Sequence, residues 1–287
     1  MVKILLDTDI GTDVDDAVCL AYLLAQPACE LLGITTVTGE AVKRASLASA
    51  LCIAAGRDIP IYPGVERPLI GEQRQTIAQQ AAALPCWAHQ VDFPQGQAIS
   101  FLADTIRAHP GEIILLTIGP LTNAGLLFST FPDIPALLKG MYLMGGDFGE
   151  DAQRAEWNIA GDPRASDIVF QAPLPDLHAV GLNVTQRVML TAEQVRQHFT
   201  APLLKPVLDF AEIWFTQFFP SITFHDPLTA AAIFDDKLCS FLPCTVTIDT
   251  VEIPGRTIWQ LGGDEQHHQV AFDVDKERYF DHFFNVF

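Results

Sequence analysis

The sequence has few basic residues. Only 17 Lys and Arg stand against 35 Asp and Glu among 287 residues, so the formal net charge is −18. So acidic a protein lacks the basic surface that neutralises phosphates and releases counterions, and we expect neither nucleic acid nor an anionic membrane as a partner. No apolar run approaches the roughly 20 residues that a membrane-spanning helix needs. Solubility is the simplest explanation of the acidic surplus.

Closely spaced cysteine pairs are also missing. The six cysteines are scattered and none belongs to a C-x-x-C pair, which argues against a zinc site. Cys19 and Cys52 lie inside apolar helical patterns, as buried thiols do in a reducing compartment. The first residues lack the charged and apolar segments of a secretory signal. We therefore expect a cytoplasmic protein.

What the sequence does contain is a repeated alternation of strand-like and helix-like segments. Residues 113–117 form a fully apolar run typical of a buried parallel strand, and residues 177–184 predict another strand. The final segment, 244–287, alternates like antiparallel strands. The pattern predicts an α/β fold with a doubly wound, mostly parallel, Rossmann-like sheet and a small antiparallel C-terminal part. Because no linker, repeat or low-complexity segment divides the chain, we expect a single domain over residues 1–287.

One acidic stretch follows the first predicted strand. Five aspartates lie within ten residues there: Asp7, Asp9, Asp13, Asp15 and Asp16. A turn and a helix cap would explain one or two of these acids, because the helix dipole favours negative charge at the first turn. Five anions beside a buried strand repel one another, and a bound cation or protonation relieves the repulsion. The stretch therefore predicts a divalent-metal site.

Oxygen-bearing residues also follow the other predicted strands, at the edge where open α/β sheets bind ligands. They include Glu40, Thr117, Asp147 and Asn183, and a further pair, His225 and Asp226, precedes an apolar helix. The set is rich in oxygen and poor in thiolate, which suits Ca²⁺ or Mg²⁺ rather than zinc. The large number of oxygen ligands favours Ca²⁺.

Four motifs together resemble the inosine-uridine nucleoside hydrolase family. They occur in the family's order: DTDIGTDVDD at 7–16, LTIGPLTN at 116–123, MGG at 144–146 with EWN at 156–158 and DP at 162–163, and HDP at 225–227. The resemblance covers residues 3 to about 235. It implies that a Ca²⁺-activated water hydrolyses the N-glycosidic bond of ribonucleosides and releases ribose and a free purine or pyrimidine base. The family is commonly oligomeric, which implies a homodimer or a homotetramer.

The resemblance also implies a role for each motif residue that holds the metal. Asp9 would be a metal ligand and the general base that accepts a proton from the attacking water. Asp16, the main-chain carbonyl of Thr117 and the carboxylate of Asp226 would complete the protein ligands. Asp7 would support the metal ligands from behind.

For the substrate, the resemblance implies that Asp15, Glu156 and Asn158 hold ribose hydroxyls and that Met144 packs on the sugar. His225, beside a metal ligand, would protonate or hydrogen-bond the departing base, or would orient its neighbours.

Two further candidates are less closely tied to a motif. His89 lies in the irregular stretch 65–95, where the family has an active-site loop and where we expect a loop with a short helix over the site. Trp214 lies four residues before Phe218 on a predicted helix, so the pair either stacks on the base or belongs to the core. His267 and His268 are expected at the surface.

The chain departs from the family pattern at several places. Two residues are added in the first motif, which leaves Asp13 as an extra acid that would take one of the neighbouring roles if the alignment shifted. Glu40 stands where many members have asparagine after the second strand. Many members have another asparagine after the Met-Gly-Gly segment, and this chain has Glu150 or Asp151 there. Acidic side chains still accept hydrogen bonds from sugar hydroxyls, so Glu40 remains a candidate substrate contact.

Two other functions fit part of this evidence. A catalytically weak nucleoside- or ribose-binding homologue would keep the same metal ligands. A Mg²⁺-dependent phosphatase of the haloacid dehalogenase type also has D-x-D after its first strand, but Gly11 stands where that motif usually has Thr or Val, and the third motif would be unexplained.

Overall fold

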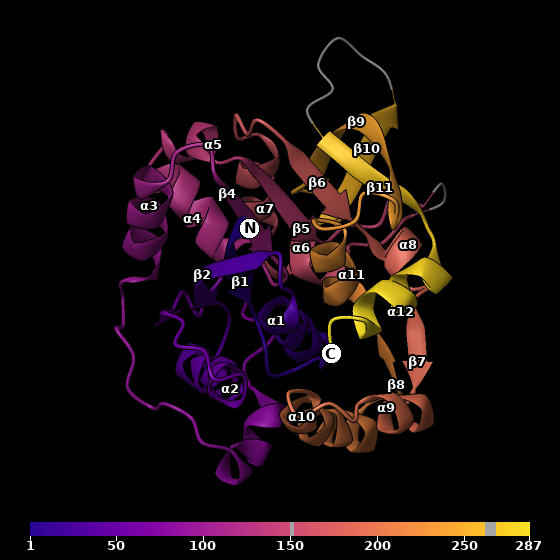
Figure 1. Ribbon diagram of the computed structural model, residues 1–287. Coiled ribbons are helices and arrows are strands. Elements are labelled where there is room, and N and C mark those ends of the chain that lie inside the picture. Colours follow the sequence, from indigo (N-terminus) through magenta and orange to yellow (C-terminus); the bar gives the residue numbers. More distant parts are fainter. Residues whose placement is uncertain (150–151, 262–267) are drawn as a thin grey trace.

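The computed structural model describes residues 1–149, 152–261 and 268–287 (Figure 1). The strands are β1 (Val2–Thr8), β2 (Cys29–Thr36), β3 (Ile61–Pro63), β4 (Ile113–Thr117), β5 (Gly140–Met144), β6 (Leu177–Val180), β7 (Met189–Thr191), β8 (Ser221–Thr223), β9 (Cys239–Asp249), β10 (Arg256–Leu261) and β11 (His268–Val274). The helices are α1 (Asp15–Ala25), α2 (Ala41–Ala54), the 3₁₀ helix η1 (Gln79–Cys86), α3 (Ala98–Ala108), α4 (Thr122–Thr130), α5 (Ile134–Leu137), α6 (Trp157–Gly161), α7 (Pro163–Phe170), α8 (Leu182–Thr185), α9 (Ala192–His198), α10 (Leu204–Gln217), α11 (His225–Ala231) and α12 (Lys276–Phe284). In this described part, no helix has both the length and the apolar character that crossing a membrane requires.

Within the described residues, nine strands form one sheet in the order β10-β9-β11-β6-β5-β4-β1-β2-β3. Neighbouring strands from β3 to β11 are parallel, whereas β9 runs antiparallel to both β11 and β10. The internal order 3-2-1-4-5-6 is that of a doubly wound sheet, whose direction of winding reverses between β1 and β4. The predicted fold class is therefore confirmed, including its antiparallel C-terminal part.

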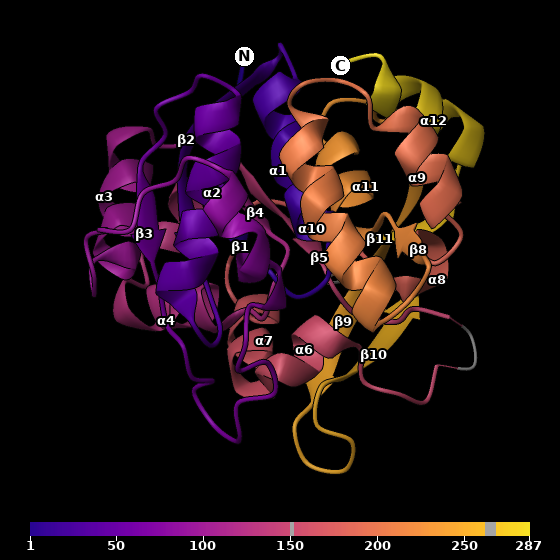
Figure 2. The ribbon, with the colours of Figure 1, turned by 90° about the horizontal axis from the view of Figure 1, so that it is seen from below.

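Strand β1 shows how the sequence pattern determines this layering. Ile4 and Leu6 pack in a core with α1, α2, α10 and α11, whereas Leu5 packs in a core with α3, α4 and α7. Successive side chains of a strand point to opposite faces, so a strand covered on both faces must be apolar throughout. Figure 1 shows α3 and α4 on one side of the sheet, and Figure 2 shows α10 and α11 beside α1 on the other.

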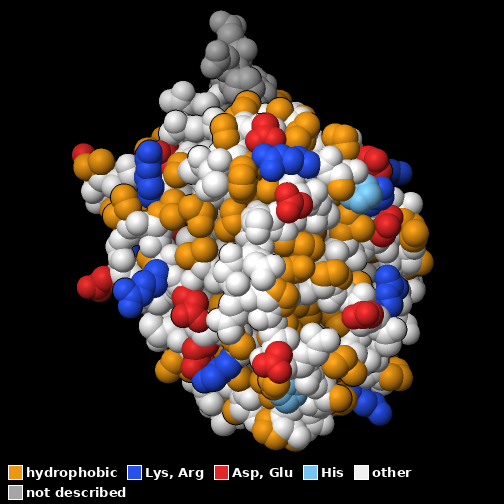
Figure 3. Space-filling view, turned by 90° about the vertical axis from the view of Figure 1, so that its left-hand side faces the viewer, with side chains coloured by type: hydrophobic (Ala, Val, Ile, Leu, Met, Phe, Trp, Pro, Cys, Tyr) orange, Lys and Arg blue, Asp and Glu red, His pale blue; other side chains and the backbone are white. Residues whose placement is uncertain are grey.

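The surface of the molecule carries mixed side chains. On the face shown in Figure 3, acidic, basic and apolar groups are interspersed. Several ion pairs are exposed to solvent, such as Arg107 with Asp133. Exposed pairs of this kind contribute little to stability, so burial of the apolar strands and helices is the main stabilising contribution.

The structure corrects three local expectations. The strand expected over 177–184 ends at Val180, and residues 182–185 form the short helix α8 instead. Strand β10 was not expected; it pairs along β9 and extends the antiparallel part. His268 is buried, not at the surface, because its ring accepts from the Val246 amide and contacts the Phe170 carbonyl. His267 lies outside the described residues.

The close contact between α4 and α7 gives a test of the packing. A Cβ at Gly125 would lie 2.7 Å from Cβ and 2.8 Å from Cα of Ala165. Gly125→Ala should therefore lower the melting temperature by several degrees, because overpacking costs ~1–3 kcal/mol and exceeds the gain in helix propensity. Differential scanning calorimetry measures the shift, with Ser129→Ala on the exposed side of α4 as the control. An unchanged melting temperature for Gly125→Ala would contradict this packing.

Candidate active site

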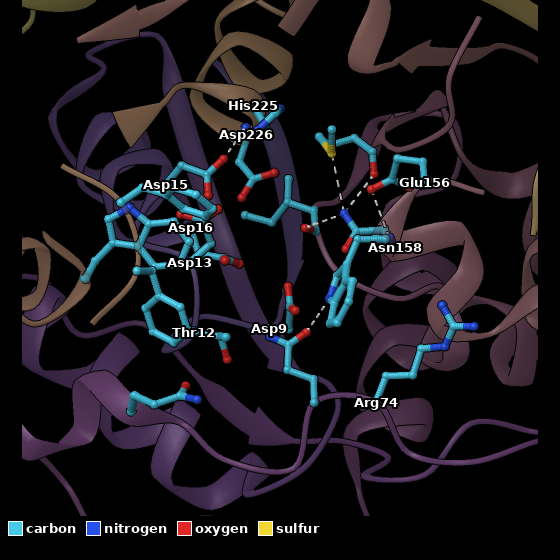
Figure 4. A pocket seen from close by; sticks show the side chains of 18 of the residues that line it. Asp9, Thr12, Asp13, Asp15, Asp16, Arg74, Glu156, Asn158, His225 and Asp226 are labelled. Carbon is cyan, nitrogen blue, oxygen red and sulfur yellow. Dashed lines mark hydrogen bonds between the residues drawn. The ribbon is translucent and has the colours of Figure 1, made fainter. Parts of the chain in front are cut away.

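A cavity of about 520 Å³ opens at the carboxyl ends of β1, β4 and β5, beside the point where the sheet winding reverses. Its walls come from the loop after β1, the segment 74–79, the region after β5, and α10 and α11. Its lining residues include Asp9, Thr12, Asp13, Asp15, Asp16, Arg74, Gln75, Ile77, Met144, Glu156, Trp157, Asn158, Trp214, Phe218, Phe219, His225 and Asp226. The aspartates lie on one side of the pocket, with Glu156 and Asn158 across from them (Figure 4).

Three buried carboxylates meet in this pocket. Asp15, Asp16 and Asp226 each offer an oxygen, and these oxygens lie within 4.8 Å of one another. Burial raises the pKa of all three well above the usual value, and the neighbouring acids raise it further. Within the described residues, none of the three pairs with Lys or Arg. This donor set of buried, unneutralised oxygens fits a hard divalent cation.

Asp9 and Asp16 are held by neighbouring backbone and hydroxyl groups. The Thr8 hydroxyl donates to Oδ1 of Asp16 at 2.5 Å. A Cβ at Gly119 would lie 2.6 Å from Oδ1 of Asp9, so only glycine lets the turn after β4 lie against this carboxylate. Burial raises the pKa of Asp9, and the positive charge of Arg44 opposes that rise. Asp9 faces the pocket but is not one of the three tightly grouped acids.

Behind these acids, the structure places Asp7 and Thr117 on neighbouring strands. Oδ1 of Asp7 accepts from the Thr35 hydroxyl at 2.5 Å and from Nδ2 of Asn123 at 2.7 Å. Burial raises the pKa of Asp7 to about 7. Thr117 pairs with Asp7 in the sheet and is fully buried, and the next residue, Ile118, lines the pocket. Asp7 itself does not line the pocket.

The opposite wall is polar and held rigidly by the backbone. Oε1 of Glu156 accepts from the Asn158 amide, and Oε2 accepts from the amides of Gly146 and Ile159, at 2.9–3.1 Å. Burial raises the pKa of Glu156 to about 7 in spite of these bonds. Nδ2 of Asn158 donates to the carbonyls of Ile118 and Met144. These contacts fix both side chains, and Met144 lies beside them.

His225 and the aromatic residues form the remaining wall. Nδ1 of His225 lies 2.7 Å from the Thr185 hydroxyl, and burial lowers the pKa of the imidazole to about 4. Trp214 stacks on Phe218 with ring centroids 4.8 Å apart, and its Nε1 donates to the Ser221 carbonyl. Both rings line the pocket and belong only partly to the core. His225 is therefore neutral near pH 7, and the aromatic rings offer flat apolar surface.

The structure places two of the expected substrate contacts outside the pocket. Glu40 caps a neighbouring loop: its Oε2 accepts from the Ala78 amide at 2.9 Å, and its Oε1 pairs with Lys43. His89 turns back to the carbonyl of Trp87, with 2.8 Å from Nδ1 to O. Neither residue lines the pocket. Glu150 and Asp151, the other expected replacements, lie outside the described residues.

Asp13, the extra acid of the first motif, does line the pocket. Its Oδ1 accepts from the Val14 amide at 2.6 Å, and burial raises its pKa to about 6. The structure therefore adds a fifth aspartate to the pocket beside Asp9, Asp15, Asp16 and Asp226. Sequence reasoning had given Asp13 no role of its own.

Several supporting residues were missed from the sequence. Thr8, Thr185 and Asn123 hold Asp16, His225 and Asp7 respectively. Asn123 belongs to the second motif, so a signal existed for it. Thr8 stands between two acids, but a threonine in a strand is too common to single out.

Solved structures share this fold over nearly the whole chain. A plant nucleoside hydrolase matches with a TM-score of 0.82 at 25% identity, covering 99% of this chain and 98% of the other. The purine-preferring ribonucleoside hydrolase from Gardnerella vaginalis matches with a TM-score of 0.83 at 25% identity, covering 99% and 97%. The architecture is therefore the α/β fold of the nucleoside hydrolases.

Sequence comparison agrees. The pyrimidine-specific ribonucleoside hydrolase RihA of Shewanella sp. (strain ANA-3) is 31% identical over an alignment 303 positions long, covering 97% of this chain and 93% of the relative. The probable uridine nucleosidase 2 of Arabidopsis thaliana is 31% identical, covering 86% and 82%. The family model described as inosine-uridine preferring nucleoside hydrolase matches residues 4–281. The chain belongs to this family and is a hydrolase that acts on N-glycosyl compounds.

The raised pKa values predict how pH affects metal binding. A carboxyl group with a raised pKa binds its proton more tightly in the folded than in the unfolded chain. The metal-free protein therefore loses stability as pH rises from about 4 through the folded pKa values, about 6 for Asp13 and about 7 for Asp7. Because a cation competes with these protons, Ca²⁺ should raise the melting temperature more at about pH 8 than at about pH 5.

Scanning fluorimetry with Ca²⁺ or a chelator measures the change in melting temperature at each of the two pH values. Asp226→Asn should lose most of the Ca²⁺ effect, whereas Asp133→Asn, which changes an exposed acid of an ion pair, should keep it. A shift that is equal at the two pH values would contradict a cation bound by these carboxyl groups.

Proposed function

We propose that this pocket hydrolyses ribonucleosides with the help of Ca²⁺, and that water is the nucleophile. The observation that carries the proposal is the group of buried carboxylates facing a rigid polar wall across a cavity of nucleoside size. The family supports hydrolysis of nucleosides, and the oxygen-only donor set supports a hard cation.

In this proposal Asp9, Asp16, Asp226 and the main-chain carbonyl of Thr117 hold the cation. When bound, the cation would neutralise the crowded acids and lower the pKa of a coordinated water. Asp9 accepts a proton from the attacking water, because it faces the pocket and stands beside the tightly grouped acids. Asp15, whose Oδ2 accepts a hydrogen bond from the Asp226 amide, belongs to the same tight group and contacts a ribose hydroxyl.

The opposite wall holds the sugar. Glu156 and the side-chain oxygen of Asn158 accept hydrogen bonds from ribose hydroxyls, and Met144 packs on the ring. The backbone contacts of Glu156 and Asn158 fix these groups before the substrate arrives, which lowers the entropic cost of orienting the ribose. A sugar held in this way presents C1′ to the acidic side of the pocket as an oxocarbenium-like state develops.

The base lies toward His225 and Trp214. Nδ1 of His225 lies 2.7 Å from the Thr185 hydroxyl, and in the tautomer that accepts this hydrogen bond the neutral imidazole carries its hydrogen on Nε2. In this proposal His225 has that tautomer and donates a hydrogen bond from Nε2 to the departing base. Trp214 and Phe218 offer ring faces on which either base class stacks. We therefore propose both purine and pyrimidine ribonucleosides as substrates.

We also propose that the chain works as one domain in the cytoplasm, as a homodimer or homotetramer. The free cysteines, five of them buried, support a reducing compartment. Light scattering coupled to size-exclusion chromatography tests the assembly.

Ribose release from a panel of nucleosides, with and without a chelator, tests the function. We expect release that stops on chelation and returns with Ca²⁺. Tight nucleoside binding without turnover would identify a binding protein, and turnover of p-nitrophenyl phosphate alone would identify a phosphatase. Either result would overturn the proposal.

The assignment of Asp9 gives a second prediction. Asp9→Asn should lower kcat by ~10²–10⁴-fold, the range that a general base contributes, while the protein stays folded because the amide has the same shape. Steady-state kinetics and circular dichroism measure the two effects. Asp58→Asn, at an exposed position after α2, serves as the control. Near-normal turnover of Asp9→Asn would contradict the assignment.

A further inference from the structure

Three loops meet beneath the acidic side of the pocket. The loop after β1, residues 9–13, carries Asp9 and Asp13. The β2–α2 junction holds two residues other than glycine at positive φ, Thr38 at 71° and Glu40 at 61°. The third loop, residues 73–78, supplies Gln75 and Ile77 to the pocket wall. None of these loops is held by pairing with a strand of the sheet at this point, so other contacts must fix them.

Arg44, in the first turn of α2, reaches all three loops. Its side chain has no exposed surface, and it is among the largest fully buried side chains of the described residues. Nε donates to the Gly39 carbonyl at 2.7 Å. Nη1 donates to the carbonyls of Asp9 and Ile10 and to the Thr12 hydroxyl, and Nη2 donates to the Ile77 carbonyl at 3.3 Å.

The chemistry of these contacts requires a guanidinium group. A buried cation is costly unless its donors are satisfied, and here carbonyl oxygens from three separate segments accept them. The planar group presents several donors in fixed directions, whereas a lysine ammonium is a compact charge that would reach only part of this set. Within the described residues Arg44 forms no ion pair, so its charge acts on the nearby acids through space, Asp9 first among them.

The loops also touch each other, so that a shift in one is passed to the next. A Cβ at Gly39 would lie 2.7 Å from Cα of Thr76, and a Cβ at Gly11 would lie 2.7 Å from a methyl group of Leu47 on α2. Nε2 of the buried Gln80 donates to the carbonyls of Thr12 and Asp13. The acidic loop is therefore held on the sides that face α2, Gln80 and the loop at 73–78, and its other side faces the pocket.

We propose that Arg44 is a positioning residue that fixes Asp9 and Asp13 against the loop at 73–78 and so sets the geometry of the acidic side of the pocket. The inference rests on the proposed role of Asp9 as ligand and base. Arg44 itself does not line the pocket, so it acts through the backbone that carries these acids. Glu156 and Asn158 are held by amides and carbonyls outside these three loops, and one contact, from Nε1 of Trp157 to Oε1 of Gln75, links their segment to the loop at 73–78.

The test compares Arg44→Lys and Arg44→Met with the wild-type enzyme. Both variants should lower kcat by ~10- to 100-fold, because a displacement of about 1 Å in a catalytic group costs that much. The KM for the nucleoside should change much less, and Ca²⁺ affinity measured by calorimetry should fall. Arg44→Lys keeps the positive charge that Arg44→Met removes. If the main role of Arg44 is to bridge the loops, Arg44→Lys should recover less than half of the kcat that Arg44→Met loses.

Hydrogen exchange gives a readout that does not depend on activity. Residues 9–14 and 73–78 should exchange faster together in both variants, while β4 and β5 keep their protection. Arg57→Met, which changes an exposed arginine just beyond the C-terminal end of the same helix, should leave kinetics and exchange unchanged. The proposal would be overturned if the folded Arg44 variants had the same kcat, the same Ca²⁺ affinity and the same hydrogen exchange as the wild-type enzyme.

A second variant keeps the test decisive if the Arg44 variants do not fold. Thr12→Val removes the hydroxyl that accepts from Arg44 and donates to the Ile77 carbonyl, but it leaves the buried charge satisfied by the carbonyls. It should lower kcat several-fold and loosen both loops. If the wild-type enzyme releases no ribose, the proposed function fails instead, and the exchange data still decide whether Arg44 holds the loops.

Discussion

Mutual repulsion among buried carboxylates is the constraint on which this site depends. Asp15, Asp16 and Asp226 cannot all be ionised so close together unless a proton or a cation offsets their charge. Their burial strengthens the repulsion, since little water screens it. Neighbouring groups hold these acids in place: the Thr8 hydroxyl orients Asp16, and the Asp226 amide orients Asp15. The positive charge of Arg44 acts on the nearby Asp9. The buried cluster could therefore hold a metal ion, whose positive charge would offset this repulsion.

The fold explains how distant acids reach one another. Asp9 and Asp16 follow β1, whereas Asp226 lies in the first turn of α11, more than 200 residues later. The parallel sheet brings the ends of β1, β4 and β5 to one edge, and α11 packs beside α1. The two walls come mainly from different elements: the acids from the starts of α1 and α11, and Glu156 and Asn158 from the segment after β5. Trp157 links the second wall to the loop at 73–78, since its Nε1 donates to Oε1 of Gln75.

Much of this was predictable from local patterns. The strand over 113–117 has the bounds expected from its apolar run, and a helix begins at His225-Asp226, where the sequence indicated one. Glu40 could not be placed in this way, because its role depends on a left-handed backbone and on Ala78, which is far away in sequence. The burial of Arg44 was equally hidden: an arginine between polar and small residues on a helix normally faces solvent, and only tertiary contacts reverse this.

If the proposed function is right, the acidic cluster binds a cation beside the ribose of the substrate. A crystal structure with Ca²⁺ and a non-hydrolysable ribonucleoside analogue would show this arrangement. We expect one ion among Asp9, Asp16, Asp226 and the Thr117 carbonyl, with the ribose hydroxyls between that ion and the wall of Glu156 and Asn158. An ion bound elsewhere, or an analogue whose sugar points away from the aspartates, would contradict the proposal.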